Sequence, residues 1–118
     1  MRWHQMSEIE TRGFDSVLDD AISEALDGPE LIYLSVDIDV LDPAFAPATG
    51  TPEPGGLTSV ELLRAIRTIV GSVETIAADV VEVAPDYEGP ANITAEAALR
   101  VILEILSSLA KKKNLAKT

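Results

Sequence analysis

Two aspartates that follow a short apolar run are the residues best placed to do chemistry. Asp37 and Asp39 come directly after the apolar residues 31–36. A strand ending in carboxylates at positions i and i+2 places both at its carboxyl end, the edge of an open α/β sheet where ligands bind. Carboxylates this close repel each other unless a proton or a cation lies between them. Because hard divalent ions prefer oxygen ligands, the pattern predicts a metal site, and a solvated turn is the alternative.

The elements that position these acids follow from hydrophobic spacing. Apolar residues recur at helical intervals in three segments, residues 31–36 form an apolar run, residues 74–83 are rich in β-branched residues, and residues 2–6 are taken as a further short strand. The strand before Asp37 is apolar throughout, which is typical of a strand covered by helices on both faces. We therefore predict an α/β fold, a three-layer αβα arrangement around a parallel three-stranded sheet. The predicted helices are 14–27, 58–70 and 94–110, and the predicted strands are 2–6, 31–36 and 74–83.

A parallel sheet brings a third acid to the same edge. If strands 31–36 and 74–83 run the same way, Glu82 lies at the edge that holds Asp37 and Asp39, although more than forty residues separate them in the chain. Asp79 lies in the middle of its strand, and we expect it to be a structural carboxylate with its own hydrogen-bond partner. The loop 37–57 is rich in proline, which favours a stiff and functional loop.

The same stretch resembles a known family. Ser35-Val36-Asp37-Ile38-Asp39-Val40-Leu41-Asp42-Pro43 and residues 46–57 resemble the C-terminal signature of the ureohydrolases, which include arginase, agmatinase and guanidinobutyrase. Residues 78–85 resemble the last strand of that family, and residues 2–9 and 12–15 are most similar to the agmatinase branch. The resemblance covers residues 1–118 as a single segment, the C-terminal part of an arginase-like fold and incomplete relative to the whole family domain.

The resemblance implies a chemistry and assigns residues to it. Asp37 and Asp39 match ligands of a pair of Mn²⁺ ions, Glu82 matches the residue that receives the substrate guanidinium, and Thr51 matches a position beside it. The implied reaction is hydrolysis of an agmatine-like guanidino compound with release of urea. Two other metal-ligand segments of the family, Gly-Gly-Asp-His and Asp-Ala-His-x-Asp, do not occur here, and we expect the single histidine, His4, to be structural. No catalytic residue is therefore assigned within this chain, which alone is expected to be inactive.

The composition of the chain limits the classes of molecule that it is expected to bind. A net charge of −11 argues against nucleic-acid and anionic-membrane partners, because both require a basic surface. It is compatible with a small cationic guanidino substrate. The absence of cysteine allows a cytoplasmic location, which we predict. Because the family's members are oligomers and the helix 94–110 has a broad apolar stripe, we also predict a homo-oligomer.

Two other functions compete with this interpretation. An apolar strand followed by Asp-x-Asp also resembles the haloacid-dehalogenase phosphatases, in which Asp37 would be the nucleophile and Asp39 the general acid. However, Leu41 stands where that family has threonine or valine. The other alternative is a non-catalytic α/β module whose role is association, because open strand edges and uncovered helix faces invite pairing.

Overall fold

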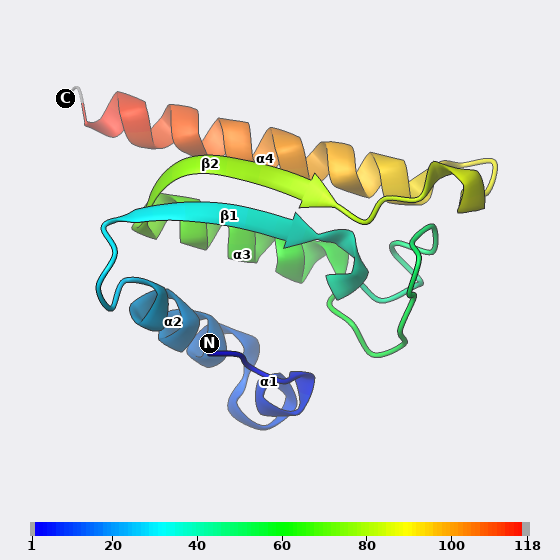
Figure 1. The fold of residues 1–118 in the computed structure, drawn as a ribbon, viewed down its shortest axis with the longest axis horizontal. Coiled ribbons are helices and arrows are strands. Elements are labelled where there is room, and N and C mark those ends of the chain that lie inside the picture. The colour runs from blue at the N-terminus through cyan, green and yellow to red at the C-terminus, as the bar shows by residue number, and fades with distance from the viewer. Residues whose placement is uncertain (1, 117–118) are drawn as a thin grey trace.

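The computed structural model describes residues 2–116, which form a small parallel sheet flanked by helices (Figure 1). The chain order alternates helices with strands after an N-terminal helical pair. The elements are α1 (Met6–Arg12), α2 (Phe14–Ala25), β1 (Leu31–Asp37), the 3₁₀ turn η1 (Ile38–Val40), α3 (Ser59–Ser72), β2 (Glu74–Val81), the 3₁₀ turn η2 (Pro85–Tyr87) and α4 (Ile93–Leu115).

The sheet consists of β1 and β2, which pair in parallel. The pairing starts at Leu31 opposite Glu74 and ends at Asp37 opposite Val81, with one register shift between Ile32 and Tyr33. The predicted α/β class and the parallel direction are therefore confirmed. The predicted third strand is wrong for residues 2–5, which have no regular structure, and for Met6, where α1 begins.

Helices cover one face of this sheet within the described residues. In β1, Ile32, Leu34 and Val36 are buried or half-buried, whereas Leu31 and Tyr33 are exposed by 56% and 58%. The expectation that this strand is covered on both faces is thus wrong for residues 2–116, because α3 and α4 pack against each other and α4 contacts β2 on the buried side. Figure 1 shows both helices running along the strands.

The core lies between the sheet, α3 and α4. Its buried side chains come from β1, from the loop that follows β1 and from α3 and α4. One apolar cluster therefore joins these helices to the segment that carries Asp37 and Asp39. Its residues with no more than 2% of their surface exposed include Ile38, Leu41, Ile66, Val70 and Val101.

The N-terminus forms a helix because local polar groups favour one there. Glu8 accepts the backbone N–H of Gln5 at 3.1 Å, which satisfies a donor that a helix start otherwise leaves free. Arg2 then pairs with Asp27 at 2.7 Å, beyond the end of α2. These contacts favour the observed structure over the strand that was predicted for residues 2–6.

The helix boundaries agree with the sequence at their starts. Thr58 and Glu61 form a capping box at the start of α3, with Glu61 N–H donating to Thr58 Oγ1 at 3.2 Å and Thr58 N–H donating to the Glu61 carboxylate at 2.9 Å. The last helix runs five residues beyond its predicted end at Ala110, to Leu115. Lys112 explains the extension, because its Nζ donates to the Val73 carbonyl at 2.6 Å.

The long loop between β1 and α3 closes on itself. Leu41 and Leu57 form a parallel bridge, in which Asp42 N–H donates to the Leu57 carbonyl at 2.9 Å and Leu57 N–H donates to the Val40 carbonyl at 2.8 Å. Gly56 lies against this backbone so closely that a Cβ on it would sit 2.5 Å from Asp42 N. The loop is therefore ordered by main-chain contacts at its base.

The close packing of Gly56 predicts that a substitution there lowers the stability of the fold, whereas a substitution at the uncrowded Gly71 raises it. We expect Gly56→Ala to lower the free energy of unfolding by about 1–3 kcal/mol, because the new methyl group overlaps backbone that cannot move aside. Gly71→Ala is the control, since nothing lies within 4 Å of a Cβ at this position in α3. It should raise stability by about 0.5–1 kcal/mol, because alanine loses less entropy in a helix. Urea unfolding followed by circular dichroism measures both, and equal behaviour of the two variants would contradict the packing argument.

Candidate functional site

The predicted acids do meet at one edge of the sheet. Asp37 is the last residue of β1 and Asp39 lies in the turn η1 that follows. Glu82 comes one residue after β2, and its neighbour Val81 is paired with Asp37. The parallel register therefore brings the carboxyl ends of the two strands to the same level, as the sequence predicted.

Asp37 shapes the turn that carries the second aspartate. Its Oδ1 accepts the backbone N–H of Asp39 at 2.9 Å, which caps the 3₁₀ turn. Asp37 is exposed and Asp39 is partly buried. The Asp37 carboxylate thus fixes the backbone of the turn that carries Asp39.

Asp39 is held by two threonine hydroxyls. Thr49 Oγ1 donates to Oδ1 and Thr51 Oγ1 donates to Oδ2 of the same carboxylate. The two donors differ in environment, because Thr49 is only 3% exposed and Thr51 lies on the surface. Thr51, expected near the substrate, therefore contacts Asp39 directly. Thr49 was missed, because its burial comes from contacts with residues distant in the sequence.

Glu82 lies against the same loop in an unusual backbone conformation. Its φ of 67° is in the left-handed region, which side chains other than glycine rarely adopt. Thr49 and Val83 form an antiparallel bridge, so the loop runs alongside the segment after β2. A Cβ at Gly50 would lie 3.8 Å from Oε2 of Glu82. Such strained residues cluster at functional sites, because the surrounding structure must hold them.

The site is acidic, and no cation of residues 2–116 forms an ion pair with it. Among residues 2–116, no ion pair involves Asp37, Asp39 or Glu82. Hard carboxylate oxygens with uncompensated charge suit a divalent cation. Within the described residues, however, no group of three or more His, Cys, Asp or Glu side chains is close enough to hold a metal ion. Asp37 and Asp39 thus offer oxygen donors of the type that metal ions prefer, but these residues alone do not form a metal site.

The other acids singled out in the sequence have separate partners. Asp79 accepts a hydrogen bond from the Tyr33 hydroxyl, as expected of a structural carboxylate. This hydrogen bond, together with that of Ser35, lowers the pKa of Asp79, and it raises the pKa of Tyr33. His4 lies 3.4 Å from Glu8 and 3.5 Å from Glu24, far along the chain from the sheet edge.

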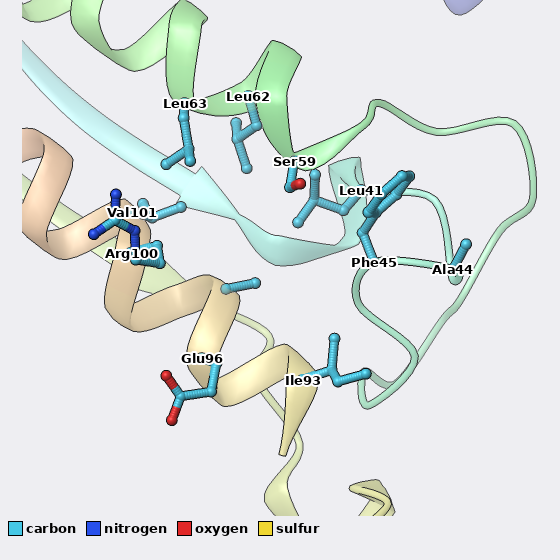
Figure 2. Close-up of a pocket in the computed structure, with 11 residues that line it drawn as sticks. Leu41, Ala44, Phe45, Ser59, Leu62, Leu63, Ile93, Glu96, Arg100 and Val101 are labelled. Atoms are coloured by element: carbon cyan, nitrogen blue, oxygen red, sulfur yellow. The ribbon is translucent and has the colours of Figure 1, made fainter. Parts of the chain in front are cut away.

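Two hollows lie beside the loop 37–57, and only one of them includes a residue of the site. Glu53 lines one of them together with Asp39, between the loop and α1. The other, a cavity of about 250 Å³ between α3, α4 and residues 41–45, is lined mainly by apolar side chains with Glu96 and Arg100 (Figure 2). Because none of Asp37, Asp39 and Glu82 lines the second hollow, it is not part of the candidate site.

Asp42 braces the loop from within. Its carboxylate accepts the N–H of Ala44 at 2.9 Å and of Gly55 at 2.9 Å. These donors, with that of Gly56, lower the pKa of Asp42 below its ordinary value. Asp42 thus shapes the turn after η1, and its contact with Gly55 links the two ends of the loop.

Comparison with known proteins agrees with the arrangement. The Arginase family profile matches residues 1–107. An agmatinase of Halalkalibacterium halodurans is 55% identical over 76 residues, which are 64% of this chain and 26% of that protein. An agmatinase of Salmonella paratyphi B is 44% identical over 106 residues, 90% of this chain and 33% of that protein. The proclavaminate amidino hydrolase of Streptomyces clavuligerus superposes with a TM-score of 0.83 at 39% identity, covering 95% of this chain and 37% of that one.

The chain therefore belongs to the arginase family. This membership decides against the haloacid-dehalogenase alternative. The chain spans about a quarter to a third of the length of the curated relatives it matches. In residues 2–116, no helix is both long enough and apolar enough to cross a bilayer.

The lowered pKa of Asp42 predicts how stability responds to acid. A carboxylate whose pKa is lower in the folded state stabilises the fold above its unfolded pKa, about 3.9, and loses this contribution as pH falls through the folded value. We expect the wild-type free energy of unfolding to fall more steeply below about pH 4 than that of Asp42→Asn. Asp86→Asn, on an exposed turn, is the control and should retain the wild-type acid profile. Urea unfolding between neutral and strongly acidic pH measures the difference. If the free energy of unfolding of Asp42→Asn depended on pH as that of wild type does, the role of the Asp42 carboxylate in holding the loop would be contradicted.

Proposed function

We propose that this chain supplies part of the active site of a metal-dependent hydrolase that releases urea from an agmatine-like guanidino compound. The observation that carries the proposal is the meeting of Asp37, Asp39 and Glu82 at one sheet edge in a member of the arginase family. The agmatinase names of several relatives support the guanidino substrate.

In this proposal Asp37 and Asp39 hold metal. They offer oxygen donors with no cation beside them among the described residues, which suits Mn²⁺. A pair of Mn²⁺ ions would supply an activated hydroxide at neutral pH. The remaining ligands would come from protein outside residues 2–116, since these contain no third ligand in place. The chain alone is then expected to bind Mn²⁺ weakly and to be inactive.

Glu82 and Thr51 are proposed to receive the substrate. A carboxylate accepts a guanidinium through two parallel charge-assisted hydrogen bonds, which orients the planar group. Glu82 is exposed at the edge of the sheet and carries no ion pair within residues 2–116, so it is available for such a partner. Thr51 is exposed on the facing loop, where its hydroxyl already contacts Asp39.

The division of roles predicts different losses on substitution. The chain would be combined with the preceding portion of the Halalkalibacterium halodurans agmatinase, and urea release and Mn²⁺ content would be measured. We expect Asp37→Asn and Asp39→Asn to abolish urea release and to lower Mn²⁺ content. Glu82→Gln should keep the Mn²⁺ content but raise KM by about tenfold or more, since a hydrogen bond to a charged group contributes about 1.5–3 kcal/mol.

Asp86→Asn is the control, because it removes a carboxylate from the exposed turn η2 and should alter neither quantity. Tight binding of two Mn²⁺ ions by the 118-residue chain alone, measured by calorimetry, would contradict the partial site. Loss of metal in Glu82→Gln would contradict the substrate role.

We also propose that the chain forms a homo-oligomer through apolar surface. The helix α4 exposes Leu99, Ile102, Leu103 and Leu106 by 43–58%. Four large apolar side chains on one helix face are a surface that association would bury. The cytoplasmic location stays a prediction.

Light scattering tests the oligomer. The wild-type chain should be a dimer or larger, and Leu106→Glu should shift it toward the monomer by placing a charge in the apolar stripe. Ser23→Glu adds the same charge on the exposed surface of α2 and should leave the mass unchanged. A wild-type chain that is a monomer at ordinary salt and unfolds cooperatively would contradict association.

A further inference from the structure

The inference starts from a loop residue that is clamped on two sides. The N–H of Ala48 donates to Thr94 Oγ1 at 2.8 Å, and the Ala48 carbonyl accepts the N–H of Ala84 at 2.9 Å. Ala48 and Thr94 both have no exposed surface. One contact reaches the start of α4 and the other reaches the segment after β2, so this point of the loop is fixed relative to both elements.

The clamp determines where the next residue points. Thr49 follows Ala48 directly, is 3% exposed and forms the antiparallel bridge with Val83. Its hydroxyl donates to Oδ1 of Asp39. A buried hydroxyl on a backbone held at neighbouring residues has little freedom to turn away, so the orientation of the Asp39 carboxylate depends on it.

The chemical type of the donor matters for what Asp39 can bind. A lysine or arginine in this place would neutralise the carboxylate, whereas a threonine hydroxyl orients it and leaves its charge in place. A carboxylate offers about four lone-pair sites. With one hydroxyl on each oxygen, from Thr49 and Thr51, acceptor capacity remains on both oxygens of Asp39.

We propose that Thr49 and Thr94 are positioning residues for the cation-binding carboxylate Asp39. Thr49 orients the carboxylate directly, and Thr94 acts through Ala48 by fixing the backbone that carries Thr49. Neither residue touches the substrate. The proposal rests on the metal-binding role of Asp39 in the proposed function. It adds residues that orient a metal ligand without being metal ligands themselves.

The test compares variants that keep or remove each hydroxyl in the whole 118-residue chain. Thr49→Val removes the donor at nearly constant volume, and Thr49→Ser retains it. Thr94→Val removes the acceptor of the Ala48 N–H, and Thr94→Ser retains it. Thr68→Val is the control, because the Thr68 hydroxyl donates to the Arg64 carbonyl within α3 and has no contact with the site.

Two readouts separate positioning from general damage. The first is Mn²⁺ affinity from electron paramagnetic resonance titration, which should fall about tenfold or more in both valine variants, as is typical when a partner of a metal ligand is removed. The second is the χ1 angle of Asp39 in the metal-free chain, from three-bond couplings to its β protons. One rotamer is expected in wild type, in both serine variants and in Thr68→Val, and averaging is expected in Thr49→Val.

The outcomes distinguish this proposal from the proposed function. If Thr49→Val releases the Asp39 rotamer but binds Mn²⁺ with the same weak affinity as wild type, the positioning role stands and the metal role of Asp39 is wrong. If Asp39 keeps one rotamer in Thr49→Val, or if Thr49→Ser loses affinity as strongly as valine, the positioning role is overturned. Circular dichroism checks folding, and Thr49→Ala, read by the same couplings, replaces the valine variant if that one does not fold.

Discussion

The parallel register between β1 and β2 is the constraint on which the site depends. It places Asp37 opposite Val81 and therefore sets Glu82 at the level of the η1 turn. Because the register is determined by apolar side chains packing on α3 and α4, a shift by one residue would turn the buried set of β1 outward. The energy that aligns the acids thus comes from the core rather than from the acids themselves, which repel one another.

Within residues 2–116, the ion pairs of arginine and lysine lie away from the sheet edge that holds Asp37, Asp39 and Glu82. In this part of the chain, arginine and lysine pair with acids on the helices or at the start of β2, as in Arg12 with Glu8, Arg67 with Glu104 and Lys112 with Glu74. At the sheet edge, backbone N–H groups and hydroxyls do the work of holding carboxylates. Neutral donors give geometry without cancelling charge, and this is the arrangement a cation-binding edge needs.

Much of this arrangement could be predicted from residue patterns, and the remainder depends on tertiary contacts. The start of α3 at Thr58 and the strand before Asp37 depend on neighbouring residues, so both could be predicted from the sequence. The meeting of Glu82 with the aspartates followed from one topological rule. The helix α1 was missed because residues 6–12 are short and mostly polar, and the contact of Glu8 with the Gln5 N–H that favours the helix is seen only in the structure. The role of Thr49 could not be seen, because the burial of that loop residue depends on residues 83–94.

The closed base of the loop has a consequence for which of its positions can be varied. Residues 41 and 57 are bridged, Gly56 tolerates no side chain, and Asp42 holds the N–H of Gly55. Residues 51–54, by contrast, are exposed beyond the clamp at Ala48. A combinatorial library should therefore randomise 52–54, where new side chains can alter the rim beside Asp39 without repacking the scaffold. Insertions of different length are accommodated best at the same tip, since both of its ends are anchored independently.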